Sequence, residues 1–147
     1  ALRTVYRVLE GKEAPADFYQ LRPVRGLSNR KEAEVTIAGK KLRVCILYGT
    51  AAAEEFLAED MNGYHFVEVM TCPGGCISGA GQPDCGSVPV SDVVRKKRIQ
   101  SLYQADEQAE RRNSMDNPEI GTIYHEFFKE PLSMLSEKLL HTTYKRK

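Results

Sequence analysis

Two cysteines set four residues apart are the residues of this sequence best suited to chemistry. Cys72 and Cys76 lie in the stretch EVMTCPGGCISGAGQP, which directly follows an apolar segment. Thiolates are strong ligands for soft and borderline metals, and the spacing allows both to bind one centre. Spacing alone leaves three interpretations open: an iron–sulfur site, a zinc site completed by Cys85 and a fourth ligand, or two thiols in a tight turn.

Glycines surround both thiols and remove side chains from the space beside them. Gly74 and Gly75 lie between the cysteines, and Gly79 and Gly81 follow with the small Ala80 between them. A bare backbone lets N–H groups approach a ligand closely, and amides that point at cluster sulfides tune the potential of iron–sulfur centres. The stretch is therefore suited to a bulky, electron-rich group.

Composition excludes several classes of protein. The chain has 147 residues, of which 41% are hydrophobic and 28% charged, with a net charge of +1. This length allows one well-formed core, and the charge provides no global field to recruit nucleic acid or anionic lipid. No apolar run is long enough to span a membrane, and no secretory signal opens the chain, so we expect a cytoplasmic protein with reduced cysteines. The first residue is Ala, which indicates processing or a piece of something longer.

The pattern of apolar residues predicts an α/β lobe around this stretch. Residues 34–48 are typical of a β-hairpin, and Thr50 can cap a helix over 51–60 that leads to a strand at 64–70. Strand, helix and strand with short links form a βαβ unit, so we expect a mainly parallel sheet. The cysteine loop, from Thr71 to Pro83, then leaves the carboxyl end of a strand, where open α/β sheets bind ligands.

Beyond Pro89 the pattern becomes helical, and we expect a helical C-terminal tail. Ser91 can cap a helix through residue 108, and Asn117 followed by Pro118 opens another. The second of these helices should bury one face, formed by Ile120, Ile123, Tyr124, Phe127 and Phe128. These features divide the chain into an α/β lobe at 1–90 and a helical tail at 91–147. The basic run from Arg95 to Arg98 is expected to be a solvated helix face.

The whole string FVEVMTCPGGCISGAGQP resembles the third H-cluster-binding motif of the iron-only (FeFe) hydrogenases. That family's pattern is roughly F-x-E-x-M-A-C-x-G-G-C-x-x-G-G-G-Q-P. The residues that match it are Phe66, Glu68, Met70, Cys72, Gly74, Gly75, Cys76, Gly79, Gly81, Gln82 and Pro83. Thr71 and Ala80 depart from it, each adding little bulk. The residues after 101 resemble the family's small-subunit-type tail, and those from 25 to 49 resemble the lead into its catalytic lobe.

The resemblance implies a role for each of the site residues. Cys72 would bind the 4Fe–4S subcluster of the H-cluster, and Cys76 would bind it and bridge to the two-iron subcluster. Met70 would lie near the cluster pocket and act with Cys76 at the catalytic centre. The glycines would leave room for the carbonyl and cyanide ligands on iron; they are Gly74, Gly75, Gly79 and Gly81.

Half of the ligand set is missing from this chain. A 4Fe–4S cluster is normally held by four cysteines, and the family takes the other two from motifs resembling T-S-C-C-P and M-P-C-x-x-K, which are absent here. Cys45 sits among apolar strand residues and is expected to be a core residue, and Cys85 an incidental thiol. The implied partner is therefore the remaining lobe or subunit, joined through a large apolar interface.

The implied activity is reversible conversion of protons and electrons into hydrogen. Further 4Fe–4S or 2Fe–2S relay clusters would lie outside the chain. The electrons would be exchanged with a carrier such as ferredoxin or a nicotinamide-dependent module. Nucleic acid and membrane partners are not expected. Two alternatives stay open: a hydrogenase-like Nar1/NARF-type iron–sulfur assembly protein, and a sensory hydrogenase with low turnover.

Overall fold

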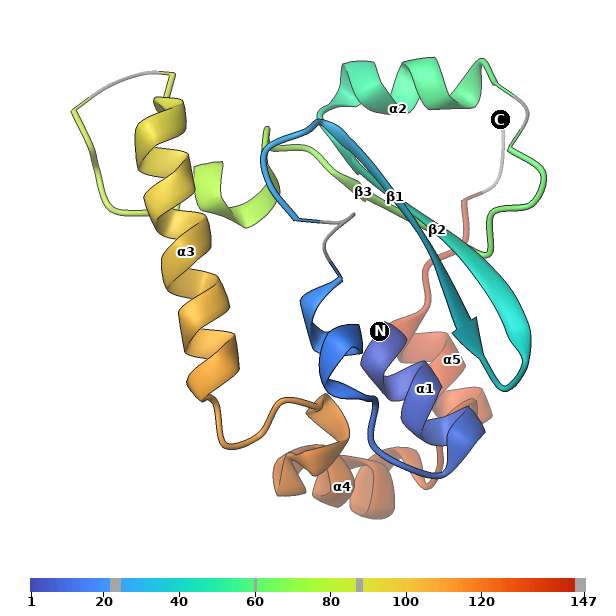
Figure 1. Cartoon of the computed structure of the whole chain (residues 1–147). Helices are drawn as coiled ribbons and strands as arrows, with labels where there is room; N and C mark the ends of the chain where they lie inside the picture. Colours follow the sequence, from blue (N-terminus) through green and yellow to red (C-terminus); the bar gives the residue numbers. More distant parts are fainter. Residues whose placement is uncertain (22–24, 60, 87–88, 145–147) are drawn as a thin grey trace. The chain divides into compact units, whose positions relative to one another are not determined.

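A computed structural model describes residues 1–21, 25–59, 61–86 and 89–144 (Figure 1). The chain divides into two compact units, Ala1–Gln108 and Ala109–Lys147. In chain order the elements, with η marking 3-10 and π turns, are α1 (Leu2–Glu10), η1 (Ala16–Gln20), β1 (Arg30–Ile37), β2 (Lys40–Tyr48), α2 (Thr50–Leu57), β3 (Phe66–Met70), η3 (Gly75–Ser78), α3 (Asp92–Gln108), η4 (Ser114–Asp116), α4 (Pro118–Ile123), η5 (Tyr124–Phe128) and α5 (Met134–Leu140).

The first unit is built on a three-stranded sheet of order β1-β2-β3. Strands β1 and β2 pair antiparallel from Ile37 opposite Lys40, and β2 pairs parallel with β3. The predicted hairpin and βαβ unit are therefore confirmed, but the prediction of a mainly parallel sheet is wrong: the sheet is mixed. The reason lies in the turn, where Ala38 and Gly39 have φ of 50° and 72°, the left-handed pair that joins antiparallel strands through two residues.

Strand β2 lies in the middle of the sheet and is buried on both faces. On one face Cys45 and Leu47 pack against Phe56 of α2, which lies at the upper end of the strands in Figure 1. On the other face Val44 and Tyr48 are buried. Alternate side chains of a strand point to opposite faces, so helices must cover both sides of a strand with this pattern.

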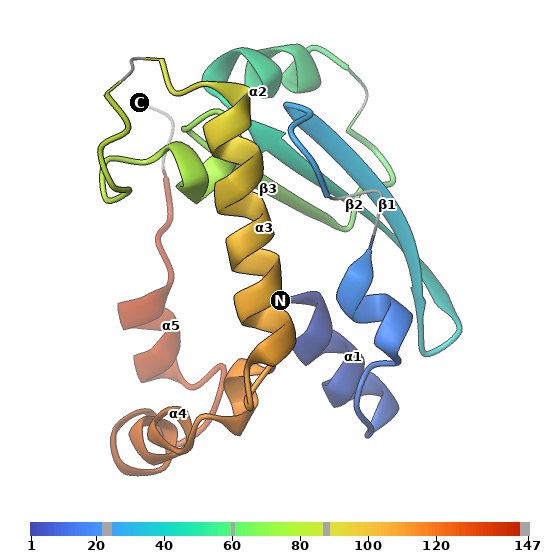
Figure 2. The same cartoon turned by 60° about the vertical axis from the view of Figure 1, so that its left-hand side comes forward.

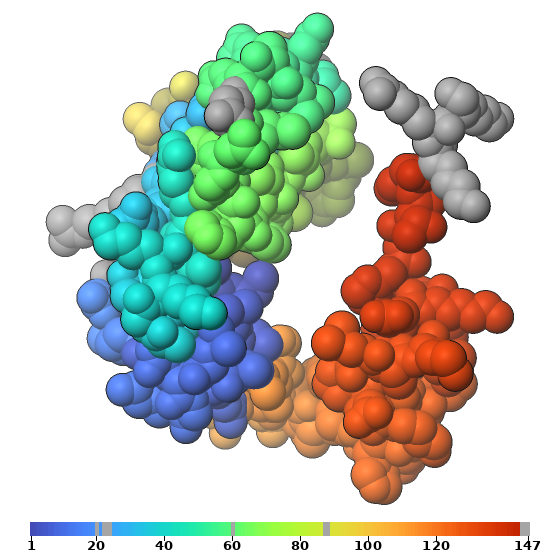
Figure 3. All heavy atoms as spheres, turned by 90° about the vertical axis from the view of Figure 1, so that its right-hand side faces the viewer, coloured from blue at the N-terminus to red at the C-terminus, as the bar shows by residue number. Residues whose placement is uncertain are grey.

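The edge strand β3 is far less covered than β2. Phe66, Val67 and Val69 are all exposed, although each is a large apolar side chain. Figure 3 shows α2 and the segment that leads into β3, in green, at the surface of the first unit. This edge therefore carries apolar surface that the described part of the unit does not bury.

Helix α2 is shorter than predicted and begins differently. It ends at Leu57, and Asp60, within the predicted span, lies outside the described residues. Thr50 is the first helical residue, while the N-cap is Gly49, which makes no side-chain cap. Gly49 has φ of 90° and its N–H donates to the Met70 carbonyl at 2.7 Å, which ties the ends of β2 and β3 together.

Helix α3 belongs to the first unit, although the sequence grouped it with the tail. Its predicted cap is confirmed: the Val94 N–H donates to Ser91 Oγ at 3.5 Å. Near its other end Asp106 accepts two hydrogen bonds from the Arg3 guanidinium, at 2.6 and 2.8 Å. This bidentate pair fastens α3 to α1 and explains why the compact unit extends to Gln108. The boundary predicted at 90/91 stays a prediction about family segments.

The second unit contains η4, α4, η5 and α5. Asn117 caps α4 by accepting from the Glu119 N–H at 3.0 Å, with Pro118 at the first position, as predicted. The predicted buried face is wrong for most of its members, since Phe128 is buried but Ile120, Ile123 and Phe127 are 41%, 43% and 52% exposed. So small a unit has too little chain to cover a continuous apolar face. Among the described residues no helix is long and apolar enough to cross a membrane.

Candidate functional site

The cysteine loop leaves the carboxyl end of β3 and lies beside α3. Strands β2 and β3 run parallel, so the loop starts at the same edge of the sheet at which β2 ends. Figures 1 and 2 both show the short η3 turn next to α3. The sequence predicted that the cysteine loop leaves the carboxyl end of a strand, and the structure confirms this position, while ligand binding there stays a prediction.

A tight turn presents the two thiols. The Gly75 N–H donates to the Cys72 carbonyl at 2.9 Å, and η3 then carries Cys76, whose carbonyl accepts from the Gly79 N–H at 3.2 Å. Cys72 is partly exposed and Cys76 is exposed, and both are free thiols. Two thiols can donate to a metal here, but the described residues contain no group of three or more His, Cys, Asp or Glu that could hold one. The donor set fits half of a four-thiolate cluster site.

Gly75 is required by the packing of this chain itself. It has φ of 78°, and a Cβ there would lie 2.7 Å from Met70 Sδ and 2.9 Å from Tyr48 Cε1. Gly74 has φ of 77°, and its Cβ would approach Ile77 Cδ1 to 3.0 Å. Both glycines serve the turn rather than the space outside it. The same distances place the Met70 thioether directly against the cysteine turn.

Gly79 and Gly81 have no such internal reason to be glycine. Gly79 has extended backbone, with φ of −74°, and its Cβ would make an ordinary contact with the Cys76 carbonyl at 3.4 Å. A Cβ at Gly81 would meet nothing within 4 Å. The chain alone would tolerate side chains at both positions, so packing within the described residues does not explain these glycines.

A buried cation and a phenol lie beneath the turn, and the sequence interpretation missed both. Lys31 is 5% exposed, and its Nζ donates to Tyr48 Oη at 3.2 Å and lies 4.4 Å from the centre of that ring. Burial lowers the pKa of Lys31. Burial also raises the pKa of Tyr48, with smaller contributions from Tyr103, Glu68 and Cys76. The signal was present in β1, where Lys31 takes an inward position in an otherwise apolar alternation with Ala33, Val35 and Ile37.

Arg98 was also missed, because the sequence assigned its basic run to a solvated helix face. That expectation fits Lys96 and Lys97, which are exposed, but Arg98 is partly buried. Its guanidinium donates to the Ile77 carbonyl at 2.7 Å and to the Pro83 carbonyl at 2.6 Å. Helix α3 therefore holds the cysteine loop directly. No feature of the run RKKR distinguishes its last residue.

The other two cysteines differ in burial. Cys45 is fully buried in the core beside Leu47 and Phe56, as predicted, and burial raises the pKa of its thiol. Cys85 is partly exposed and follows the loop.

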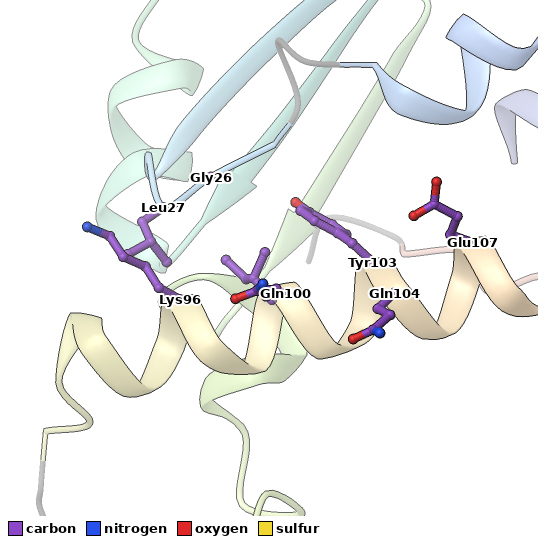
Figure 4. A pocket seen from close by; sticks show the side chains of 8 residues that line it. Gly26, Leu27, Lys96, Gln100, Tyr103, Gln104 and Glu107 are labelled. Atoms are coloured by element: carbon purple, nitrogen blue, oxygen red, sulfur yellow. The ribbon is translucent and has the colours of Figure 1, made fainter.

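A cavity of about 570 Å³ lies along α3 (Figure 4), and neither thiol is among the residues that line it. Its lining residues are Gly26, Leu27, Lys96, Ile99, Gln100, Tyr103, Gln104 and Glu107. The Arg25 guanidinium stacks over the Tyr103 ring at 3.9 Å beside it. The lining contains no thiol or histidine, so this cavity is not the candidate metal site.

Two family models match the chain in succession. Residues 1–80 match the model described as iron only hydrogenase large subunit, C-terminal domain. Residues 92–147 match the model described as iron hydrogenase small subunit. The cysteine turn falls within the first match, and helix α3 falls within the second.

Curated relatives match along nearly the whole chain. The NADP-reducing hydrogenase subunit HndD of Solidesulfovibrio fructosivorans is 40% identical over 148 residues, which cover 98% of this chain and 24% of that protein. Iron hydrogenase 1 of Clostridium pasteurianum is 34% identical over 150 residues, covering 99% of this chain and 26% of that protein. The chain thus spans about a quarter of the length of these relatives.

A further curated relative and a solved structure also match. Protein NAR1 of Arabidopsis thaliana is 30% identical over 139 residues, covering 90% of this chain and 27% of that protein. A structure of a variant of the FeFe-hydrogenase HydA1 from Chlamydomonas reinhardtii has a TM-score of 0.73 at 28% identity. That match covers 97% of this chain and 42% of the other.

Proposed function

Since the chain belongs to the iron-only hydrogenase family, as the match to the C-terminal domain of the large subunit shows, we propose that it is an H-cluster-binding lobe of such a hydrogenase. In this role the chain supplies part of the site at which protons and electrons are reversibly converted into hydrogen. The observation that carries the proposal is the cysteine turn, in which two accessible thiols follow a parallel strand and open space adjoins them.

Each site residue has a proposed task that its surroundings support. The Cys72 and Cys76 thiolates, which are partly exposed and exposed, would hold the H-cluster as two of its protein ligands. When bound, the H-cluster supplies the redox chemistry that interconverts protons, electrons and hydrogen. Met70, whose thioether packs against Gly75 in the turn, would lie beside the bound cluster and act with Cys76 at the catalytic centre.

The glycines have two different tasks. Gly74 and Gly75 allow the left-handed backbone of the turn, which sets the direction of both thiols. Gly79 and Gly81 keep the adjoining space free for the ligands on iron.

The proposal requires a partner lobe or subunit. Two thiols cannot complete a four-thiolate site, and the chain spans about a quarter of its hydrogenase relatives. The exposed apolar residues of β3 and of the second unit offer surface for a large interface. The partner would contribute the remaining cysteines, and relay clusters with an electron carrier would lie beyond it. Within this chain we assign residues 1–90 to the catalytic lobe and 91–147 to the small-subunit-type tail.

The test replaces single cysteines in the native protein, purified without oxygen together with its accompanying lobe. Iron content and the infrared bands of iron-bound carbonyl and cyanide are measured for Cys72→Ala, Cys76→Ala and the control Cys85→Ala. We expect the first two variants to lose the bands and most of the cluster iron, while the control keeps both. Retention of bands and iron in both Cys72→Ala and Cys76→Ala would contradict the proposal.

The match to NAR1 favours one second candidate, an iron–sulfur assembly role without hydrogen chemistry. The same infrared measurement separates the two candidates, because an assembly factor would bind iron without carbonyl or cyanide bands. Bands with very low hydrogen turnover would instead indicate the sensory alternative.

A further inference from the structure

We propose that Arg98 is a positioning residue that fixes the cysteine loop, so that the small-subunit-type helix α3 determines where Cys76 is held. The inference rests on the proposed function for the purpose of the loop, but the contact itself is independent of it. Arg98 spans the loop, reaching the carbonyl of Ile77, which directly follows Cys76, and the carbonyl of Pro83 at the far end.

The other hydrogen bonds described within residues 76–83 are local. The Gln82 N–H donates to the Gly79 carbonyl at 3.1 Å, and Gln82 Nε2 donates to the Cys76 carbonyl at 3.2 Å. Among the hydrogen bonds described for residues 76–83, the two from Arg98 are the ones that come from another element. Without them, short turns alone would hold residues 78–82, and the loop could move relative to the sheet.

The guanidinium is suited to this task. Its planar fork donates two hydrogen bonds in a fixed geometry, and charge-assisted hydrogen bonds are roughly twice as strong as neutral ones. The Ile77 side chain is buried, which anchors the first contact inside the unit. A lysine at this position would keep the charge but could not bridge both carbonyls rigidly.

Helix α3 is itself held in place, so the contact can transmit position. The bidentate pair from Arg3 to Asp106 and the stacking of Arg25 on Tyr103 fasten the helix at two further points. Helix α3 is the first part of the segment that matches the small-subunit model. Through α3 that segment positions the cysteine loop, in addition to covering the lobe.

The experiment compares Arg98→Gln with Arg98→Lys and with the matched control Lys97→Gln. Lys97 is exposed on the same helix, so its replacement makes the same change in charge without touching the loop. The first measurement is hydrogen exchange of the Gly79 and Gln82 amides. Loss of two charge-assisted hydrogen bonds should accelerate exchange about 10-fold or more in Arg98→Gln, with a smaller effect in Arg98→Lys and none in Lys97→Gln.

The second measurement is made on the cluster-loaded native protein. We expect Arg98→Gln to change the electron paramagnetic resonance line shape and the midpoint potential of the 4Fe–4S subcluster, and Lys97→Gln to leave both unchanged. Exchange equal to that of the parent would overturn the loop contact. Faster exchange with an unchanged spectrum and potential would overturn the positioning role.

Two further outcomes can also be interpreted. If the parent itself binds no cluster, the proposed function fails, while the exchange measurement still tests the contact. Unfolding of Arg98→Gln would be detected because its buried Cys45 would become reactive. In that case the exchange and the cluster spectrum are compared between the parent and Arg98→Lys, which keeps the helix and the charge.

Discussion

Replacing Gly75 with alanine tests whether the cysteine turn is as tightly constrained as its contacts indicate. The new methyl group would meet Met70 Sδ at 2.7 Å and Tyr48 Cε1 at 2.9 Å. Met70 is flexible and can move away. The Tyr48 ring cannot move as easily, because it is buried and its hydroxyl accepts a hydrogen bond from Lys31.

The expected magnitude has two parts. Holding alanine at a φ of 78° costs about 1–2 kcal/mol, and forcing a methyl group into a packed site adds roughly 1–3 kcal/mol. We therefore expect Gly75→Ala to lower the free energy of unfolding by about 2–5 kcal/mol. The assay is chemical denaturation at neutral pH, followed by circular dichroism.

Two control glycines separate the parts. Gly86 has φ of 69°, and a methyl group there would meet nothing within 4 Å, so Gly86→Ala should cost the backbone part alone, about 1–2 kcal/mol. Gly81 has open space and no left-handed backbone, so Gly81→Ala should change stability by less than about 0.5 kcal/mol. Equal losses for Gly75→Ala and Gly86→Ala would refute the packing argument.

Three other predictions concern buried and partly buried ionisable groups. Lys31→Met should raise the free energy of unfolding by about 1 kcal/mol at neutral pH, because it removes a poorly solvated cation. Because burial lowers the pKa of Lys31, the folded protein releases this proton at a lower pH than the unfolded chain does. The stability gained by Lys31→Met, measured by denaturation, should therefore shrink as pH rises toward the ordinary lysine pKa. The Tyr64 hydrogen bond is the main cause that lowers the pKa of Glu32, so the ionised Glu32 should stabilise the fold at neutral pH by less than about 1 kcal/mol. Glu32→Gln should lose this stabilisation, and the difference between variant and parent should vanish as pH falls through the lowered pKa. In iron-free protein, iodoacetamide should label Cys76 at least about 100-fold faster than Cys45, as peptide mass spectrometry would detect, and equal rates would contradict the described burial.

Local sequence signals predicted the framework of the site well. The hairpin follows from two left-handed turn residues between apolar strands, and the caps at Ser91 and Asn117 follow from side chains that accept N–H groups. The placement of the cysteine loop at a strand's carboxyl end came from the βαβ pattern. Each of these depends on contacts between residues close in sequence.

Contacts between distant residues could not be predicted in the same way. Arg98 reaches Ile77 and Pro83 across the unit, and its neighbours Lys96 and Lys97 have the same charge but remain exposed. Helical spacing predicted a buried apolar face in the second unit, but Ile120, Ile123 and Phe127 are exposed, because spacing cannot say what covers a face. The mixed sheet could have been predicted from the sequence, because the hairpin makes one of the two strand pairings antiparallel and leaves at most one parallel pairing in a three-stranded sheet.

The most direct test of the central claim is the native mass and iron content of the purified protein, measured without denaturation or oxygen. We predict that these residues occur together with a larger cysteine-rich lobe or subunit. The assembly should hold about six irons beyond any relay clusters, and Cys76→Ala should lose the cluster iron. A monomeric, iron-free chain in its native state would contradict the claim, because Cys72 and Cys76 would then bind nothing.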